Sequence, residues 1–233
     1  MKGILYGVGI GAGNPQFLTY QAAKYIRKCN IIAIPDSGTE NFIAYDIAVQ
    51  MIPELLQKQI IKISMPMTKD KIILKEHHKQ GSKMILKYLE NDNVAFLTLG
   101  DPSIYATYMY IHKLVEKNGG QTKMICGIPS FCAVSATLGI SLTEGSDMLH
   151  VIPASYNLEY ALSLSGTKVL MKAGKSFQSI KNILFQNKHK FDCYMVENCG
   201  MKTEKKYFSI EEFPEHTGYF STIIVKDKKK ESL

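Results

Sequence analysis

The sequence lacks any apolar run long enough to cross a membrane. A membrane-spanning helix needs about 18 consecutive apolar residues, whereas the longest runs here are strand-sized, such as residues 30–34. The first eight residues faintly resemble a signal peptide, but glycines interrupt their apolar part and no small-x-small cleavage site follows. We therefore expect an opening β-strand at residues 4–8 and no membrane partner.

Cysteine pairs at the spacing of zinc sites are missing as well. None of the five cysteines forms a C-x-x-C pair or stands at zinc-finger spacing from a histidine. Their odd number and their scatter through apolar stretches favour a reducing compartment, so we expect a cytoplasmic protein without a protein-bound metal. Cys132 falls in an apolar helical stretch without an evident base partner, and is expected to be a core residue rather than a nucleophile.

Arginine is scarce in a chain that is otherwise basic. Of the 28 basic residues only Arg27 is an arginine, and the formal net charge is +7. A basic chain attracts polyanionic partners, but bidentate guanidinium contacts to bases or phosphates are almost absent here. Neither a basic helix nor an aromatic platform interleaved with arginine is evident. A nucleic-acid-binding module, whose binding would depend steeply on salt, is therefore disfavoured.

What the chain does have is an alternation of short β-branched runs with longer stretches of helical period, the pattern of an α/β fold. Thr19 and Asn41 are suitable N-cap residues for two of the helices. Strands are predicted at residues 4–8, 30–34, 60–65, 94–99, 123–126, 148–152, 168–171, 192–196 and 219–225. Helices are predicted at residues 19–28, 42–51, 69–89, 105–117 and 130–138.

Two domains are predicted from a strong helix-stop signal in the middle of this pattern. The helix over 105–117 ends at Asn118-Gly119-Gly120, a strong helix stop. We place the boundary there, with an N-terminal α/β domain over residues 1–120 and a C-terminal α/β domain over residues 121–233. A polar segment rather than a crossover helix separates the last two predicted strands, so the second sheet is expected to be mixed, with antiparallel strands near its end.

A glycine-rich loop follows the first strand, Gly7-Val8-Gly9-Ile10-Gly11-Ala12-Gly13-Asn14-Pro15. Its glycines indicate a backbone held close to a ligand or, structurally, a tight turn that needs positive φ. The loop nominally satisfies the dinucleotide fingerprint, with Asp36 at the ribose position, which leaves an NAD(P)-dependent oxidoreductase as an alternative. The match is weak, because Asn14-Pro15 delays the helix to about Thr19 and Pro35 is expected to bend the chain before Asp36.

Two further loops end strands and begin helices. In Leu99-Gly100-Asp101-Pro102-Ser103-Ile104-Tyr105 the glycine lets a ligand approach the backbone and Asp101 can accept hydrogen bonds. Asp101 and Ser103 are equally ordinary N-cap residues. In Cys126-Gly127-Ile128-Pro129-Ser130-Phe131-Cys132, Ser130 is either an N-cap or a ligand contact. The sequence alone leaves both readings open.

These three loops, in this order, resemble the tetrapyrrole methylases, S-adenosylmethionine-dependent methyltransferases built from two α/β domains. The shared pattern is the glycine-rich loop, a strand that ends in Gly-Asp-Pro, and an Ile-Pro-Ser helix start. Two segments, residues 99–108 and 139–145, are similar to the precorrin-2 / cobalt-factor II C20-methyltransferases of cobalamin biosynthesis. The resemblance runs from Lys2 to about Val225.

The resemblance implies a site in the cleft between the domains. No catalytic residue is assigned; Glu144, His150 or water could take the C20 proton. The family's acidic residue in the glycine-rich loop is replaced here by Asn14, so a proton-transfer role for that position is doubtful. The cofactor contacts implied are Pro35, Gly100, Asp101, Ser103, Ile104, Tyr105, Ser130, Phe131, Met171, Lys172, Ser221 and Thr222. The implied substrate contacts are Gly9, Gly11, Gly13 and Asn14.

The resemblance also implies the partners. The substrate is a tetrapyrrole with eight carboxylates, which a basic cleft attracts, and any cobalt belongs to the substrate rather than to the protein. Methyl transfer from a sulfonium to a meso carbon is a direct displacement, which orientation and preorganised electrostatics can drive without a nucleophile. A homodimer is expected. The nearest alternative is a sister methylase of the same pathway that acts at another ring position.

Overall fold

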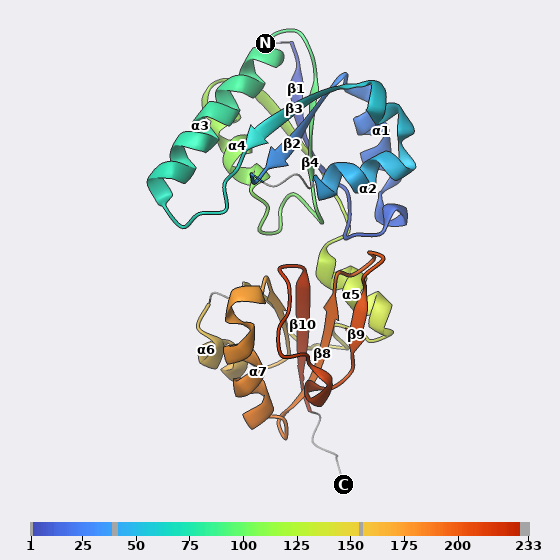
Figure 1. The fold of residues 1–233 in the computed structure, drawn as a ribbon, viewed down its shortest axis with the longest axis vertical. Coiled ribbons are helices and arrows are strands. Elements are labelled where there is room, and N and C mark those ends of the chain that lie inside the picture. The colour runs from blue at the N-terminus through green and yellow to red at the C-terminus, as the bar shows by residue number, and fades with distance from the viewer. Residues whose placement is uncertain (1, 39–41, 154–155, 229–233) are drawn as a thin grey trace. The chain divides into compact units, whose positions relative to one another are not determined.

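The computed structural model describes residues 2–38, 42–153 and 156–228. The chain divides into two compact units, Met1–Pro129 and Ser130–Leu233. Each unit holds a five-stranded sheet with helices against both faces (Figure 1). The expected α/β fold with two sheets is therefore confirmed.

The first sheet is parallel throughout, in the order β3-β2-β4-β1-β5. β1 and β4 are buried along nearly their whole length, as central strands of a parallel sheet are. The strand β2 continues through Pro35 instead of bending before it, because its pairing with β4 ends at Ala33 and no ladder bond to β4 is lost at the proline. The strands are β1 (Ile4–Gly9), β2 (Ile31–Asp36), β3 (Gln59–Ser64), β4 (Val94–Thr98) and β5 (Gln121–Ile125).

In the described part of the first unit, four α-helices cover this sheet, two on each face (Figure 1). α1 (Tyr20–Lys28) and α2 (Ile43–Met51) pack on one face, and α3 (Lys71–Tyr88) and α4 (Tyr108–Lys117) pack on the other. The Thr19 hydroxyl accepts a hydrogen bond from the Ala22 amide (3.0 Å), which confirms it as the N-cap of α1. Asn41, the predicted cap of α2, lies outside the described residues.

The helix predicted over residues 105–117 begins only at Tyr108. Tyr105 has φ of +47°, in the left-handed region, and a residue there cannot belong to a right-handed helix. The residues before α4 therefore form a loop, and its shape is set by Tyr105 rather than by helix periodicity.

The domain boundary also lies later than the predicted position after residue 120. β5 pairs with β1 in the first sheet, from Ile4 opposite Gln121 to Val8 opposite Ile125. The chain crosses to the second unit only after Pro129. Glycines 119 and 120 end a helix, but the strand that follows them belongs to the sheet already built.

The second sheet is mixed, in the order β6-β7-β10-β8-β9. β6 and β7 are parallel, whereas β10 runs antiparallel to both β7 and β8, and β8 runs antiparallel to β9. This confirms the antiparallel strands expected near the end of the chain. The strands are β6 (Leu149–Pro153), β7 (Thr167–Met171), β8 (Phe191–Glu197), β9 (Lys205–Tyr207) and β10 (Ser221–Asp227).

The helices of the second unit lie on both faces of its sheet (Figure 1). α5 (Ser130–Leu138), with the predicted bounds, packs against β8 and β10. α6 (Leu158–Ser163) and α7 (Phe177–Gln186), absent from the predicted helices, pack on the other face. Short 3-10 turns occupy Pro15–Phe17, Pro53–Gln57, Gly174–Ser176 and Ile210–Glu212. No helix among the described residues is long and apolar enough to cross a membrane.

Candidate active site

The three loops singled out in the sequence follow three neighbouring strands of the first sheet. β1 lies between β4 and β5, and the three strands are parallel. Their carboxyl ends therefore meet at one edge, the usual ligand-binding edge of an open α/β sheet. Pro35, near the end of β2, lies at the same end of the sheet and pairs with Ile63 of β3. We call this the first-sheet edge.

Backbone groups from the three loops are in direct contact at the first-sheet edge. The amide of Gly100 donates to the carbonyl of Gly11 (2.9 Å), and the amide of Gly11 donates to the carbonyl of Gly100 (3.3 Å). A Cβ on Gly9 would lie 2.6 Å from the Gly100 carbonyl oxygen and 2.7 Å from the Gly127 nitrogen. Glycine at position 9 is therefore required by the neighbouring backbone.

The other predicted substrate contacts also have structural roles in the loop after β1. Gly11 and Gly13 have φ near +80°, and a Cβ on Gly11 would lie 2.7 Å from the Cβ of Phe17. The Asn14 side chain accepts from the Gln16 amide (2.9 Å) and caps the first 3-10 turn. Their contact with a substrate stays a prediction, since these packing requirements already explain the residue types.

Asp101 lies at the centre of the first-sheet edge. One oxygen of its carboxylate accepts from the Gly127 amide (2.9 Å), and the other accepts from the amide (2.8 Å) and the hydroxyl of Ser103. These bonds cap a turn and join two loops, so the reading of Asp101 and Ser103 as N-caps of the next helix is wrong. The side chains of Ile104 and Tyr105 follow, with the tyrosine 46% exposed.

The second unit brings a further group of predicted residues to one edge of its own sheet. Met171 ends β7 and pairs directly with Thr222 near the start of β10. Strand alternation places both side chains on the sheet face opposite to Leu170 and Ile223, which pack with α7. That is the face on which α5 packs. We call this the second-sheet edge.

The remaining predicted residues of the second unit follow β7, begin β10 or begin α5. Lys172 follows β7 with φ of +60°, and its ammonium lies 5.9 Å from the centre of the Tyr219 ring. Ser221 alternates with Thr222, and its hydroxyl donates to the Gly218 carbonyl (3.1 Å). Ser130 is the first residue of α5, and the buried Phe131 follows it. The placement of a cofactor between the two domains stays a prediction.

Sequence reasoning missed Glu197, which ends β8 opposite Ser221 at the second-sheet edge, and Asn198, which follows it and donates its amide to the Phe220 carbonyl (2.8 Å). The Glu197 carboxylate accepts from the Tyr207 hydroxyl (2.9 Å) and from the Thr217 hydroxyl. Asn198 has φ of +49°, which places it with Tyr105 and Lys172 as the non-glycine residues in the left-handed region among those described. The signal for both residues was their position at a strand end.

Comparison with known proteins identifies the family. Residues 4–214 match the family described as Tetrapyrrole (Corrin/Porphyrin) Methylases. The chain belongs to the tetrapyrrole methylases. This overturns the oxidoreductase alternative, and the structure gives the reason: α1 begins only at Tyr20, away from the glycine-rich loop, and the Asp36 carboxylate accepts from the Gly38 amide (2.9 Å) in a local turn.

Individual tetrapyrrole methylases extend the match over almost the whole chain. A Methanocaldococcus jannaschii protein named probable cobalt-precorrin-2 C(20)-methyltransferase is 31% identical over 97% of each chain. A Sinorhizobium protein named precorrin-2 C(20)-methyltransferase is 25% identical over 96% of this chain and 95% of that one. A solved structure of a putative cobalamin synthesis related protein from Corynebacterium diphtheriae has a TM-score of 0.75 at 19% identity, covering 98% of this chain and all of that chain, and shows the shared fold.

Glu144 and His150, the side chains considered as bases from the sequence, lie away from the second-sheet edge, whereas the Glu197 carboxylate lies at that edge. Glu144 lies 3.9 Å from Lys226, near the far end of β10, and His150 contacts the Ser165 carbonyl (2.9 Å). Cys132 is exposed instead of buried in the core, and desolvation raises the pKa of its thiol, which keeps it protonated. Over residues 2–38, 42–153 and 156–228, no three His, Cys, Asp or Glu side chains cluster closely enough to hold a metal ion.

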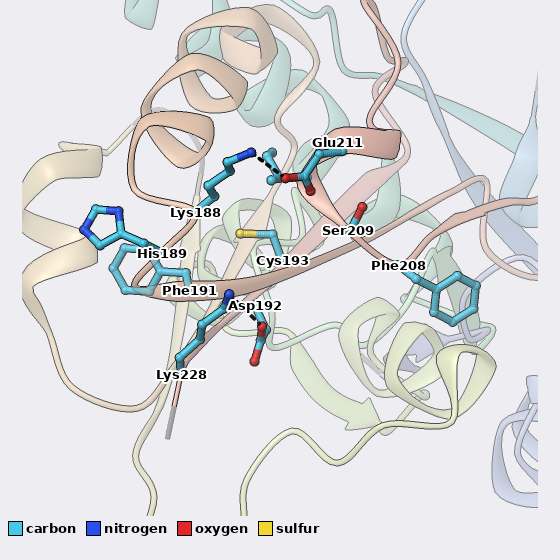
Figure 2. A pocket seen from close by; sticks show the side chains of 10 residues that line it. Lys188, His189, Phe191, Asp192, Cys193, Phe208, Ser209, Glu211 and Lys228 are labelled. Carbon is cyan, nitrogen blue, oxygen red and sulfur yellow. Dashed lines mark hydrogen bonds and ion pairs between the residues drawn. The ribbon is translucent and has the colours of Figure 1, made fainter. Parts of the chain in front are cut away.

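The pocket in Figure 2 lies around the start of β8 and the end of β10, and it has a volume of about 310 Å³. Its charges pair with one another: Lys188 contacts Glu211 (2.9 Å) and Lys228 contacts Asp192 (3.8 Å). Burial raises the pKa of the Cys193 thiol to about 12, so it is not a thiolate nucleophile. The paired charges and the protonated thiol give no reason to place the reaction in this pocket, which is separate from the second-sheet edge.

Proposed function

We propose that the chain is an S-adenosylmethionine-dependent methyltransferase that methylates C20 of cobalt-factor II (cobalt-precorrin-2) or of precorrin-2 in cobalamin biosynthesis. The observation that carries this proposal is the 31% identity over 97% of each chain with a relative of that name.

The first-sheet edge is the proposed cofactor site of the first unit. Its loops offer surfaces that suit a nucleoside joined to an amino acid, namely the half-buried Ile104 and the exposed ring of Tyr105, beside glycines that leave room for a ligand. A solved Thermus thermophilus uroporphyrin-III C-methyltransferase, 16% identical with a TM-score of 0.71 and covering 96% of this chain and 92% of that one, was crystallised with S-adenosylhomocysteine. In the second unit the proposed contacts are Ser130, Phe131, Met171, Lys172, Ser221 and Thr222.

The proposed chemistry asks little of side-chain acids and bases. The bound cofactor would supply a methyl group on a positively charged sulfur: the new carbon–carbon bond forms as the sulfur–methyl bond breaks, S-adenosylhomocysteine leaves, and C20 loses its proton to a base or to water. The protein's task is to align carbon, methyl and sulfur and to exclude water, and orientation of this kind accounts for about 7–11 kcal/mol of a barrier in favourable cases. The Glu197 carboxylate at the second-sheet edge already accepts hydrogen bonds from the hydroxyls of Tyr207 and Thr217, and no catalytic role is assigned to it.

The proposed substrate carries eight carboxylates, and the cations that meet them are lysines. Several lysines already have structural partners: Lys58 donates to the carbonyls of Arg27 (2.8 Å) and Cys29 (2.5 Å), and Lys181 donates to that of Phe213 (2.7 Å). Lys226 donates to the carbonyl of Ser141 (2.9 Å). Substrate recognition therefore depends on the remaining lysines, hydroxyls and backbone amides.

The decisive experiment is anaerobic incubation with methyl-labelled S-adenosylmethionine and either cobalt-factor II or precorrin-2, with the label located by mass spectrometry and NMR. Label at C20 is the expected result, and the faster substrate identifies the pathway. Label at another ring position would replace the proposal with a sister methylase. No transfer to either substrate, with S-adenosylhomocysteine still bound, would indicate a different acceptor.

We also propose that the enzyme works as a cytoplasmic homodimer. The five cysteines lie in the described part of the chain and are all free thiols, which suits a reducing compartment. Sedimentation equilibrium at micromolar concentration should give twice the 26.2 kDa chain mass. A measured mass of one chain would contradict the proposed homodimer and would leave the proposed reaction unaffected.

A further inference from the structure

The loops after β4 and β5 meet across the end of a strand that separates them. In the sheet, β1 lies between β4 and β5. Nevertheless a Cβ on Gly127 would lie 2.0 Å from the Gly100 carbonyl oxygen. The two loops therefore close over the end of β1, directly above Gly9, whose own Cβ would clash with both. Three backbones are held in contact at one point without any side chain between them.

The Asp101 carboxylate is the group that holds this closure. One of its oxygens accepts a hydrogen bond from the Gly127 amide, and the other accepts hydrogen bonds from the amide and the hydroxyl of Ser103. Hydrogen bonds to a charged acceptor are roughly twice as strong as neutral ones. The carboxylate thus joins residues 26 positions apart in the sequence, and both of its oxygens are used within the first unit. We call Asp101, Ser103 and Gly127 the Asp101 clamp.

We propose that Asp101 is a positioning residue that acts through Gly127 and Gly100 and does not bind the cofactor with its carboxylate. The clamp holds the loops after β4 and β5 in the conformation that binds the cofactor, and loss of the clamp lets the two loops separate. This inference rests on the proposed function, in that the ligand of the first-sheet edge is taken to be S-adenosylmethionine. It revises the role that the family resemblance implies for Asp101 itself.

The test measures the protection of the Gly127 amide and the affinity for the ligand in separate experiments. Hydrogen exchange of the Gly127 amide, followed by NMR in the ligand-free protein, reports the clamp without any cofactor. Calorimetric titration with S-adenosylhomocysteine reports the site. Asp101→Ala should accelerate Gly127 exchange and lower the affinity by about tenfold or more, as loss of bonds to a charged acceptor does.

Graded variants separate positioning from direct contact. Ser103→Ala removes one donor, so it should leave the Gly127 amide protected and lower the affinity only about threefold. Asp101→Asn keeps one acceptor oxygen and should fall between wild type and Asp101→Ala in both readouts. Asp70→Ala is the matched control, because Asp70 likewise accepts two backbone amides, those of Ile72 (2.8 Å) and Ile73 (3.2 Å), at the start of α3. It should change neither readout.

Each outcome decides one part of the inference. An unchanged rate of Gly127 amide exchange in Asp101→Ala and in Asp101→Asn would show that Asp101 does not hold the two loops together. Reduced affinity with a Gly127 amide that stays protected would mean that the carboxylate contacts the ligand directly. Faster exchange with unchanged affinity would show that the clamp does not shape the site. A wild-type protein that fails to bind S-adenosylhomocysteine would refute the proposed function and the cofactor half of this inference, whereas the exchange data would still decide the clamp.

Discussion

At the first-sheet edge the loops touch one another through backbone, with the Asp101 carboxylate joining two of them, whereas at the second-sheet edge the contacts described are between side chains. At the first, Gly9, Gly100 and Gly127 touch through carbonyls, amides and Cα atoms. At the second, Met171 and Thr222 face each other across a strand pair, and the Glu197 carboxylate gathers two hydroxyls. A backbone edge has no flexible atoms that can yield to a larger residue. The two edges should therefore differ sharply in their tolerance of substitution.

The largest difference in stability between the two edges is expected when a glycine at each is replaced by alanine. In Gly127→Ala the new Cβ meets backbone at 2.0 Å and 2.7 Å, and such overpacking should lower the free energy of unfolding by about 3 kcal/mol. In Gly218→Ala, beside the second-sheet edge, the new Cβ meets nothing within 4 Å, so the change should stay within about 0.5 kcal/mol. Urea unfolding measures both. Equal losses would contradict the distinction between the edges.

A smaller loss of stability is expected at the second-sheet edge from Glu197→Ala. The substitution leaves the hydroxyls of Tyr207 and Thr217 without their common acceptor, and the loss of hydrogen bonds to a charged group should cost about 2 kcal/mol. Guanidinium unfolding gives the value. Thr217→Val removes only one of the two donors and should cost less; a larger loss for Thr217→Val would show that Glu197 does not organise this edge.

Thr222→Val tests whether the second-sheet edge contacts the cofactor. The substitution keeps the β-branched shape beside Met171, so the free energy of unfolding should change by less than about 1 kcal/mol. If the hydroxyl contacts the ligand, the affinity for S-adenosylhomocysteine should fall about threefold to tenfold. Ile224→Val, further along β10 and buried, is the control for packing alone. Unchanged affinity in Thr222→Val would remove this hydroxyl from the proposed site.

The smallest effect expected is a change in alkaline stability. Burial, then the hydrogen bond and charge of Glu197, raise the pKa of Tyr207 to about 12 from its ordinary value of 10.0. Because the phenol of the unfolded chain ionises first, this contribution to stability is complete below pH 10 and is lost as the pH rises toward 12. Glu197→Gln should lower the pKa of Tyr207, as measured by tyrosinate absorbance. An unchanged titration would show that burial alone causes the shift.

Local signals in the sequence were sufficient for most elements. The N-cap of α1 and the bounds of α5 follow from residues within one turn of each other. α7 was missed although Phe177, Ile180 and Leu184 have helical spacing. The start of α4 could not be predicted, because a tyrosine in the left-handed region has no sequence signature and is held there by its surroundings.

The candidate site was only partly predictable for the same reason. Strand-end positions identified the three loops of the first-sheet edge, and the parallel sheet brings them together. Asp101 was recognised as an acceptor, but its donor at Gly127 was not. Glu197 and Asn198 were missed because their place beside Ser221 depends on the antiparallel pairing of β8 with β10.

The sequence alone predicts an α/β fold and three loops at strand ends, because strand periodicity, helix caps and turn glycines act over a few residues. The resemblance of these loops to the tetrapyrrole methylases indicates the family. The boundary after Pro129, the clamp from Asp101 to Gly127 and the two contrasting edges required the folded structure. Each of these depends on contacts between residues far apart in the chain. Pairing of β5 with β1 and closure of two loops over Gly9 are set by packing, which local patterns do not encode.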